Sequence, residues 1–114
     1  MSPLTTTYTT GDVICTPYFP HVEDPSEGEA RYLICIEDLH DNIIVVPLTK
    51  NLNQLDRFPK SFIIRKTSSE GQLMKIPVDS LVVPEKAKMI KKLGMYKHGR
   101  CSDDMLEQLC SLCL

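Results

Sequence analysis

The stretch that decides the fold is residues 32–48, YLICIEDLHDNIIVVPL, in which two apolar runs flank a mostly polar segment. The runs Tyr32–Ile36 and Ile43–Leu48 are rich in the β-branched and aromatic residues that favour strands. Asp38–Asn42 between them has the side chains typical of a turn. The stretch therefore predicts a β-hairpin near the centre of the chain.

Further short strands are expected on both sides of this hairpin. Asp12–Phe19 follows Gly11 and predicts a first strand, and Pro20–Glu29 holds the prolines, glycine and acidic residues of a loop. Downstream we expect a loop with one helical turn over Asn51–Lys60, strands over Ser61–Lys66, Leu73–Ile76 and Asp79–Val83, a turn over Ser68–Gly71, and a short helix or irregular connection over Glu85–Lys92.

The chain is expected to end in an amphipathic helix. Ser102 is a good N-cap, and Asp103 and Asp104 follow where the helix dipole favours acidic side chains. Apolar residues then recur at helical spacing, namely Met105, Leu106, Leu109, Leu112 and Cys113. Many short strands and one terminal helix predict an α+β, mainly β fold, with the strands in a small, strongly bent barrel or sandwich.

Length and composition set limits on organisation and function. The 114 residues fit one domain over 11–114 after a polar tail over 1–10. Thirteen basic and 15 acidic residues give a net charge of −2, which is not the strongly basic balance of most nucleic-acid binders. A local basic stretch nevertheless runs from Lys86 to Arg100. No signal-peptide pattern opens the chain and no apolar run is long enough to span a bilayer, so we expect a cytoplasmic protein with reduced cysteines and no membrane partner.

The cysteines near the end of the chain raise the question of a zinc site. His98, Cys101, Cys110 and Cys113 supply four ligands of the kinds that zinc prefers. Cys110 and Cys113, however, lie within the expected helix and lack the glycine or proline turn of a zinc knuckle. The interpretation we favour is a set of buried or half-exposed thiols with no metal bound.

A candidate site lies at one end of the predicted hairpin. Arg31 directly precedes the first strand, and Thr49 closes the second. Antiparallel pairing brings the start of one strand beside the end of the other, so both residues are expected at one rim of the sheet. A guanidinium beside a hydroxyl is a suitable pair for binding a phosphate or another oxyanion.

The order of motifs along the chain resembles the MazF/PemK toxins, a bacterial family of metal-independent endoribonucleases. No single motif carries the likeness, which extends from residue 11 to residue 112. The matching segments are Gly11–Ile14, Phe19–Pro20, Gly28 to Arg31, Ile43–Thr49, Asp79–Val83, Lys91–Gly94 and Ser102–Met105.

This resemblance implies a fold, an activity and a set of site residues. The fold would be an SH3-like β-barrel with a C-terminal helix, assembled as a two-fold homodimer. The activity would be that of a type II toxin cutting single-stranded RNA without metal or cofactor, and a cognate antitoxin protein would block the RNA groove. Arg31 and Thr49 match the family's catalytic arginine and threonine. The expected substrate-binding residues are His21, Gly28, Lys50 and Ser80, with His21 also a candidate general base.

Two other classes of function stay open. A non-catalytic relative could bind RNA or protein through the same groove, as departures from the family pattern indicate: Tyr32 replaces a proline, Ser80 a glutamine and Val82 an arginine. A gyrase-poisoning toxin would share the barrel but act by binding an enzyme.

Overall fold

Three consecutive strands form the centre of the computed structural model, which describes residues 9–20, 28–91 and 96–113, and only the backbone of 16–20 and 28–31. β1 (Asp12–Pro20), β2 (Gly28–Asp38) and β3 (Asn42–Thr49) pair antiparallel in sequence order. The predicted hairpin is therefore confirmed. Its turn is closed by the Leu39 N–H, which donates to the Asn42 carbonyl over 2.9 Å.

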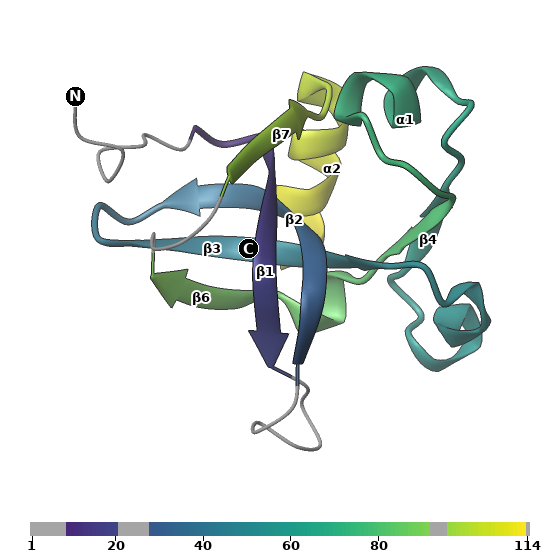
Figure 1. The fold of residues 1–114 in the computed structure, drawn as a ribbon, viewed down its shortest axis with the longest axis horizontal. Helices are drawn as coiled ribbons and strands as arrows, with labels where there is room; N and C mark the ends of the chain where they lie inside the picture. The colour runs from purple at the N-terminus through teal and green to yellow at the C-terminus, as the bar shows by residue number, and fades with distance from the viewer. Residues whose placement is uncertain (1–8, 21–27, 92–95, 114) are drawn as a thin grey trace.

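Four shorter strands extend this meander (Figure 1). β6 (Lys88–Lys91) pairs with the first half of β3, and β5 (Ser80–Val82) pairs with its end. β4 (Phe62–Ile64) pairs with β5, and β7 (Tyr96–Arg100) pairs with β1. The order is β4-β5-β3-β2-β1-β7, with β6 beside β3, and no pairing among the described strands closes it into a barrel. The chain thus has an α+β fold dominated by an antiparallel sheet.

The terminal helix agrees with its prediction. α2 (Asp103–Cys113) begins after Ser102, whose Oγ accepts the Met105 N–H over 3.1 Å. The helical turn expected in the loop after β3 is the 3-10 helix η1 (Leu52–Arg57). A second 3-10 helix, η2 (Pro84–Lys86), follows β5 and carries Pro84 at its first position.

Four segments differ from the predictions. Ser68–Gly71 and Leu73–Ile76 were expected as a turn and a strand, but residues 69–74 form α1 (Ser69–Met74), which Ser68 caps by accepting the Gly71 N–H. Glu85–Lys92, expected as a helix or irregular connection, contains the end of η2 and then strand β6. The expected loop Pro20–Glu29 is shortened at both ends, because Pro20 pairs with Gly28 and residues 21–27 lie outside the described part. β7 was not predicted.

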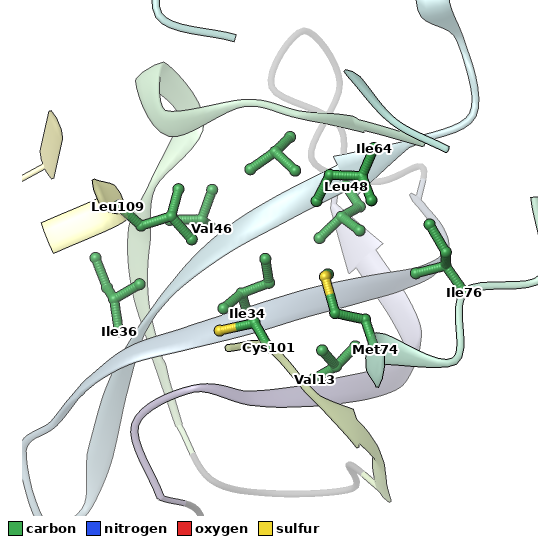
Figure 2. Packing of buried hydrophobic residues seen from close by; sticks show 11 residues of the cluster. Val13, Ile34, Ile36, Val46, Leu48, Ile64, Met74, Ile76, Cys101 and Leu109 are labelled. Carbon is green, nitrogen blue, oxygen red and sulfur yellow. The ribbon is translucent and has the colours of Figure 1, made fainter. Parts of the chain in front are cut away.

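Successive side chains of the central strands point to opposite faces of the meander, and apolar side chains are buried on both faces. One face contributes to the main core, where Leu109 of α2 and Met74 of α1 pack against the sheet (Figure 2). The opposite face forms a second cluster of Ile14, Leu33, Cys35, Ile43 and Val45. The helical stripe found in the sequence therefore packs into the chain's own core: Leu109 is fully buried and Met105 is half-buried against the main cluster.

Two of the sequence-based expectations concern the chain as a whole. In the described part of the chain, no helix has the length and apolar character needed to cross a membrane. The polar tail over 1–10 lies mostly outside the described residues, which begin at Thr9.

Candidate functional site

The β2–β3 register determines how Arg31 and Thr49 lie relative to each other. The last paired positions at this end are Leu33 and Pro47, and Arg31 and Thr49 each lie two residues farther along their strands. No bulge interrupts β2 between positions 31 and 33, where the pairing with β1 is regular. Positions 31, 33, 47 and 49 therefore share one face of the sheet, as the rim hypothesis requires. The structure describes the backbone of Arg31 but not its side chain.

Figure 1 shows that the strands carrying the two positions run in different directions at this end of the sheet. β2 begins beside β1 at the tip of their hairpin, whereas the end of β3 runs toward β5 and η1. Thr49 pairs with Leu81 of β5 rather than with a residue of β2. The two strands thus diverge at this end of the sheet.

Thr49 is half-buried at the last position of β3. Its Oγ1 accepts the backbone N–H of Asn51 over 3.2 Å, which turns the chain out of the strand and into η1. No described residue accepts its hydroxyl hydrogen. Within the described residues, the Thr49 side chain thus accepts one hydrogen bond and keeps a donor for a ligand oxygen.

The other expected substrate-binding residues lie at different distances from Thr49 along the chain. Lys50 follows Thr49 directly and is exposed. Gly28 pairs with Pro20 at the far end of the β1–β2 hairpin, and His21 lies outside the described residues.

Ser80 lies away from this rim. It pairs with Ile64, which belongs to the main core, whereas its neighbour Leu81 pairs with Thr49. Ser80 and Thr49 are therefore on opposite faces of the sheet. The Ser80 side chain is buried, and its hydroxyl donates to the Val78 carbonyl over 2.9 Å. In this structure the hydroxyl is therefore hydrogen-bonded to a backbone carbonyl of the same chain.

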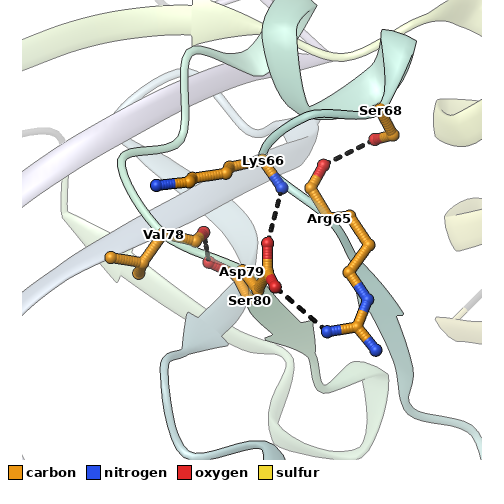
Figure 3. A network of polar contacts seen from close by, with 6 residues as sticks. All are labelled: Arg65, Lys66, Ser68, Val78, Asp79 and Ser80. Carbon is orange, nitrogen blue, oxygen red and sulfur yellow. Dashed lines mark hydrogen bonds and ion pairs between the residues drawn. The ribbon is translucent and has the colours of Figure 1, made fainter.

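Next to Ser80, Asp79 joins the end of β4 to the start of β5 (Figure 3). Its carboxylate accepts the Lys66 N–H over 2.9 Å and binds the Arg65 guanidinium over 3.0 Å. Two hydrogen bonds lower the pKa of Asp79 below its ordinary value. The bond from the Lys66 backbone has the larger effect, and the bond from the Arg65 side chain has the next largest. No local sequence pattern indicates this contact, because its partners lie 13 and 14 residues away along the chain.

A second carboxylate, Asp12, binds two cations of the basic stretch. Its oxygens lie 3.2 Å from the Arg100 guanidinium and 3.3 Å from the Lys97 ammonium group. Asp12 is almost completely buried at the start of β1, next to Gly11, whose φ of +94° few other residues adopt. The stretch from Lys86 to Arg100 is thus partly neutralised from within the fold.

The residues weighed as zinc ligands contact different parts of the backbone. His98 Nε2 lies 2.5 Å from the Lys75 carbonyl oxygen, while Cys110 and Cys113 donate to the carbonyls of Ile36 and Pro84. Burial raises the pKa of the Cys101 thiol to about 11 and also raises the pKa of Cys113. Over residues 9–20, 28–91 and 96–113, no three His, Cys, Asp or Glu side chains gather as a metal site would require.

No protein-family model matches the chain, and a search of the curated proteins finds no match.

Proposed function

We propose that this chain is a metal-independent endoribonuclease of the MazF/PemK type, which acts as the toxin of a toxin–antitoxin pair. The observation that carries the proposal is the placement of positions 31 and 49 on one face of the sheet, at the end where β2 and β3 diverge. The hydroxyl hydrogen of Thr49, for which no described residue is an acceptor, supports it. The order of motifs along the sequence supplies the class of reaction.

The reaction needs few protein groups because RNA carries its own nucleophile. The ribose 2′-oxygen attacks the adjacent phosphorus, the bond to the 5′-oxygen breaks, and the 2′-proton is removed while the leaving oxygen gains one. Arg31 would stabilise the extra negative charge on phosphorus with charge-assisted hydrogen bonds. Thr49 would donate its hydroxyl to a phosphoryl oxygen. A guanidinium keeps its proton to a pH of about 12, so we assign Arg31 to charge stabilisation before proton transfer.

The same proposal includes the finer features of the family. The bent sheet would correspond to an SH3-like barrel. Two copies of the chain would form a dimer that holds single-stranded RNA in a shared groove. An antitoxin protein in the same cytoplasm would block that groove.

The first test is cleavage of a mixed-sequence single-stranded RNA by purified protein, with and without EDTA. We expect cutting in both conditions. Arg31→Ala should lower the rate about a hundredfold, on the order of 3 kcal/mol of transition-state stabilisation. Thr49→Ala should cost less, because a neutral donor is weaker than an ionised one. Arg31→Lys should restore activity only in part, since lysine lacks the planar fork.

Thermal melting of each variant shows whether a loss of rate reflects unfolding. A fully active Arg31→Ala protein would show that the site is misplaced. RNA binding without any cleavage by the wild type would instead support a non-catalytic relative, and inhibition of gyrase without RNA binding would support the third class.

A further inference from the structure

Two cations from different elements lie over the same aromatic ring. The Arg57 guanidinium carbon is 5.6 Å from the centroid of the Phe58 ring, and the Lys86 ammonium nitrogen is 5.2 Å from it. Arg57 ends η1, whereas Lys86 ends η2 on the other side of β4 and β5 in the sequence. We call Arg57, Phe58 and Lys86 the cation platform.

Backbone contacts fix the platform in place. The Lys60 N–H donates to Glu85 over 2.6 Å, which joins the segment after η1 to η2. The Ser61 side chain is buried and its hydroxyl donates to the Phe58 carbonyl, also over 2.6 Å. These two hydrogen bonds join the segment that carries Arg57 and Phe58 to η2, which carries Lys86.

Within the described part of the chain, neither cation of the platform has a carboxylate partner. Arg65 and Arg100 each bind a carboxylate, Asp79 and Asp12 respectively. No described carboxylate lies within ion-pair distance of Arg57 or Lys86; besides the ring, Arg57 contacts only the Gln54 amide oxygen, over 3.4 Å. An aromatic ring attracts a cation through its quadrupole and leaves its net charge unchanged. This pair can therefore still attract an anion.

The platform also lies close along the chain to the candidate site. η1 begins three residues after Thr49, and the exposed Lys50 lies between them. Lys60, two residues after Phe58, adds a further exposed cation, whose ammonium group donates to the Leu112 carbonyl over 3.4 Å. Exposed cations thus occur at the end of β3, at the end of η1 and just after it, in the segment that leads from Thr49 to the platform.

We propose that the cation platform binds phosphodiester groups of a single-stranded RNA that passes Thr49. This inference rests on the proposed function and names the residues that would position the strand beyond the scissile bond. Arg57 and Lys86 would bind phosphates, and Phe58 would position the two cations. Binding of this kind does not depend on base sequence.

The test is binding of a single-stranded oligonucleotide that carries 2′-O-methyl groups and so cannot be cut by attack of its 2′-oxygen. Fluorescence anisotropy is measured over a series of salt concentrations. For single strands, the logarithm of affinity changes with the logarithm of salt with a slope of about −0.7 per phosphate contact. The double variant Arg57→Gln/Lys86→Gln should bind more weakly, with a slope reduced in magnitude by about 1.4.

The matched control is Lys66→Gln/Lys91→Gln, which removes the same charge from two exposed lysines on other elements. We expect its slope to stay near that of the wild type. Phe58→Leu keeps both charges and an apolar side chain but removes the aromatic ring. Weaker binding by this variant, which retains the charge count, would show that the ring positions the two cations. Melting confirms that each variant is folded, and Arg57→Lys/Phe58→Tyr provides a second, conservative variant that should bind close to normally.

The outcomes separate the two proposals. If the platform variant binds the oligonucleotide with the wild-type affinity and slope, the platform proposal is overturned, whether or not the wild type cuts RNA. If the wild type fails to cut RNA but the platform variant loses salt-dependent binding, the nuclease proposal fails and the platform stands. A loss that the control shares equally would show only a net-charge effect and would also overturn the platform.

Discussion

At the scale of single residues, two carboxylates of the described structure each neutralise neighbouring cations. Asp12 binds Arg100 and Lys97, and Asp79 binds Arg65, whereas Arg57 lies on an aromatic ring. A carboxylate partner compensates a positive charge, and an aromatic ring only positions it. This difference would allow a chain with an overall charge of −2 to contain the proposed local site for phosphate.

Asp79 gives a prediction about pH. Its folded-state pKa is lowered from the ordinary value of 3.8, so its contribution to stability is present above that value and is lost as the pH falls through the lower folded-state pKa. Asp79→Asn should therefore unfold at a lower temperature than the wild type at pH 7, and the gap should shrink below about pH 4. Thermal melts of both proteins at pH 7, 5 and 3 measure it.

The control for this prediction is Asp56→Asn, which removes an exposed carboxylate of η1. Its melting temperature should differ little from that of the wild type at any of these pH values. An Asp79→Asn gap that stays constant down to pH 3 would show that the carboxylate is not the source of the effect.

The residues of the candidate site differ in how far the sequence could predict them. Thr49 could be placed because it closes a local hairpin whose register follows from neighbouring apolar residues. The burial of Ser80 could not, because it depends on pairing with Ile64 of another strand. The partners of Asp12 lie up to 88 residues away, and no local pattern encodes such a contact.

At the scale of elements, close approach of the backbone explains why residues 69–74 form a helix instead of the predicted turn and strand. A Cβ on Gly71 would clash with the Arg65 carbonyl oxygen, and one on Gly99 would clash with the Met74 carbonyl oxygen. α1 is thus packed tightly between the end of β4 and strand β7. Leu73, Met74 and Ile76 have the apolar character of a strand, but the Ser68 cap and this packing select a helix. Local propensity was overruled by a tertiary contact.

The start of α2 gives a prediction about stability. Ser102 Oγ accepts the Met105 N–H and also donates to Glu70 of α1 over 2.6 Å, while the Ser102 N–H donates to the same carboxylate over 2.7 Å. Ser102→Ala removes the cap and one of the two bonds to Glu70. We expect a loss of about 1–2 kcal/mol in the free energy of unfolding, measured by urea denaturation.

Ser111→Ala is the matched control, because Ser111 is an exposed residue of the same helix. It should change the free energy of unfolding by less than about 0.5 kcal/mol. Equal effects of the two substitutions would contradict a capping role for Ser102.

At the scale of the whole molecule, the prediction concerns how many copies of the chain assemble. An apolar stripe such as that of α2 can serve as a dimer face, but Leu109 is fully buried in the chain's own core. The dimer prediction therefore depends on the proposed family and on the modest aliphatic core of a chain of 114 residues. Light scattering at micromolar concentration should give twice the mass of one chain, and a monomer mass that persists at higher concentration would contradict the proposal.

The pairing of β1 with β7 has a consequence for how the protein is made. Arg100 binds Asp12 across 88 residues of chain, and the Cys101 N–H donates to the Gly11 carbonyl beside it. At ~5–20 residues per second, a ribosome needs on the order of 4 to 18 s to synthesise that interval. During this time β1 can pair with β2, while its other edge has no strand to cover it. An uncovered edge invites pairing with other chains. The nascent protein is therefore most open to chaperones, or to a binding partner that adds a strand, in the seconds before its last strand emerges.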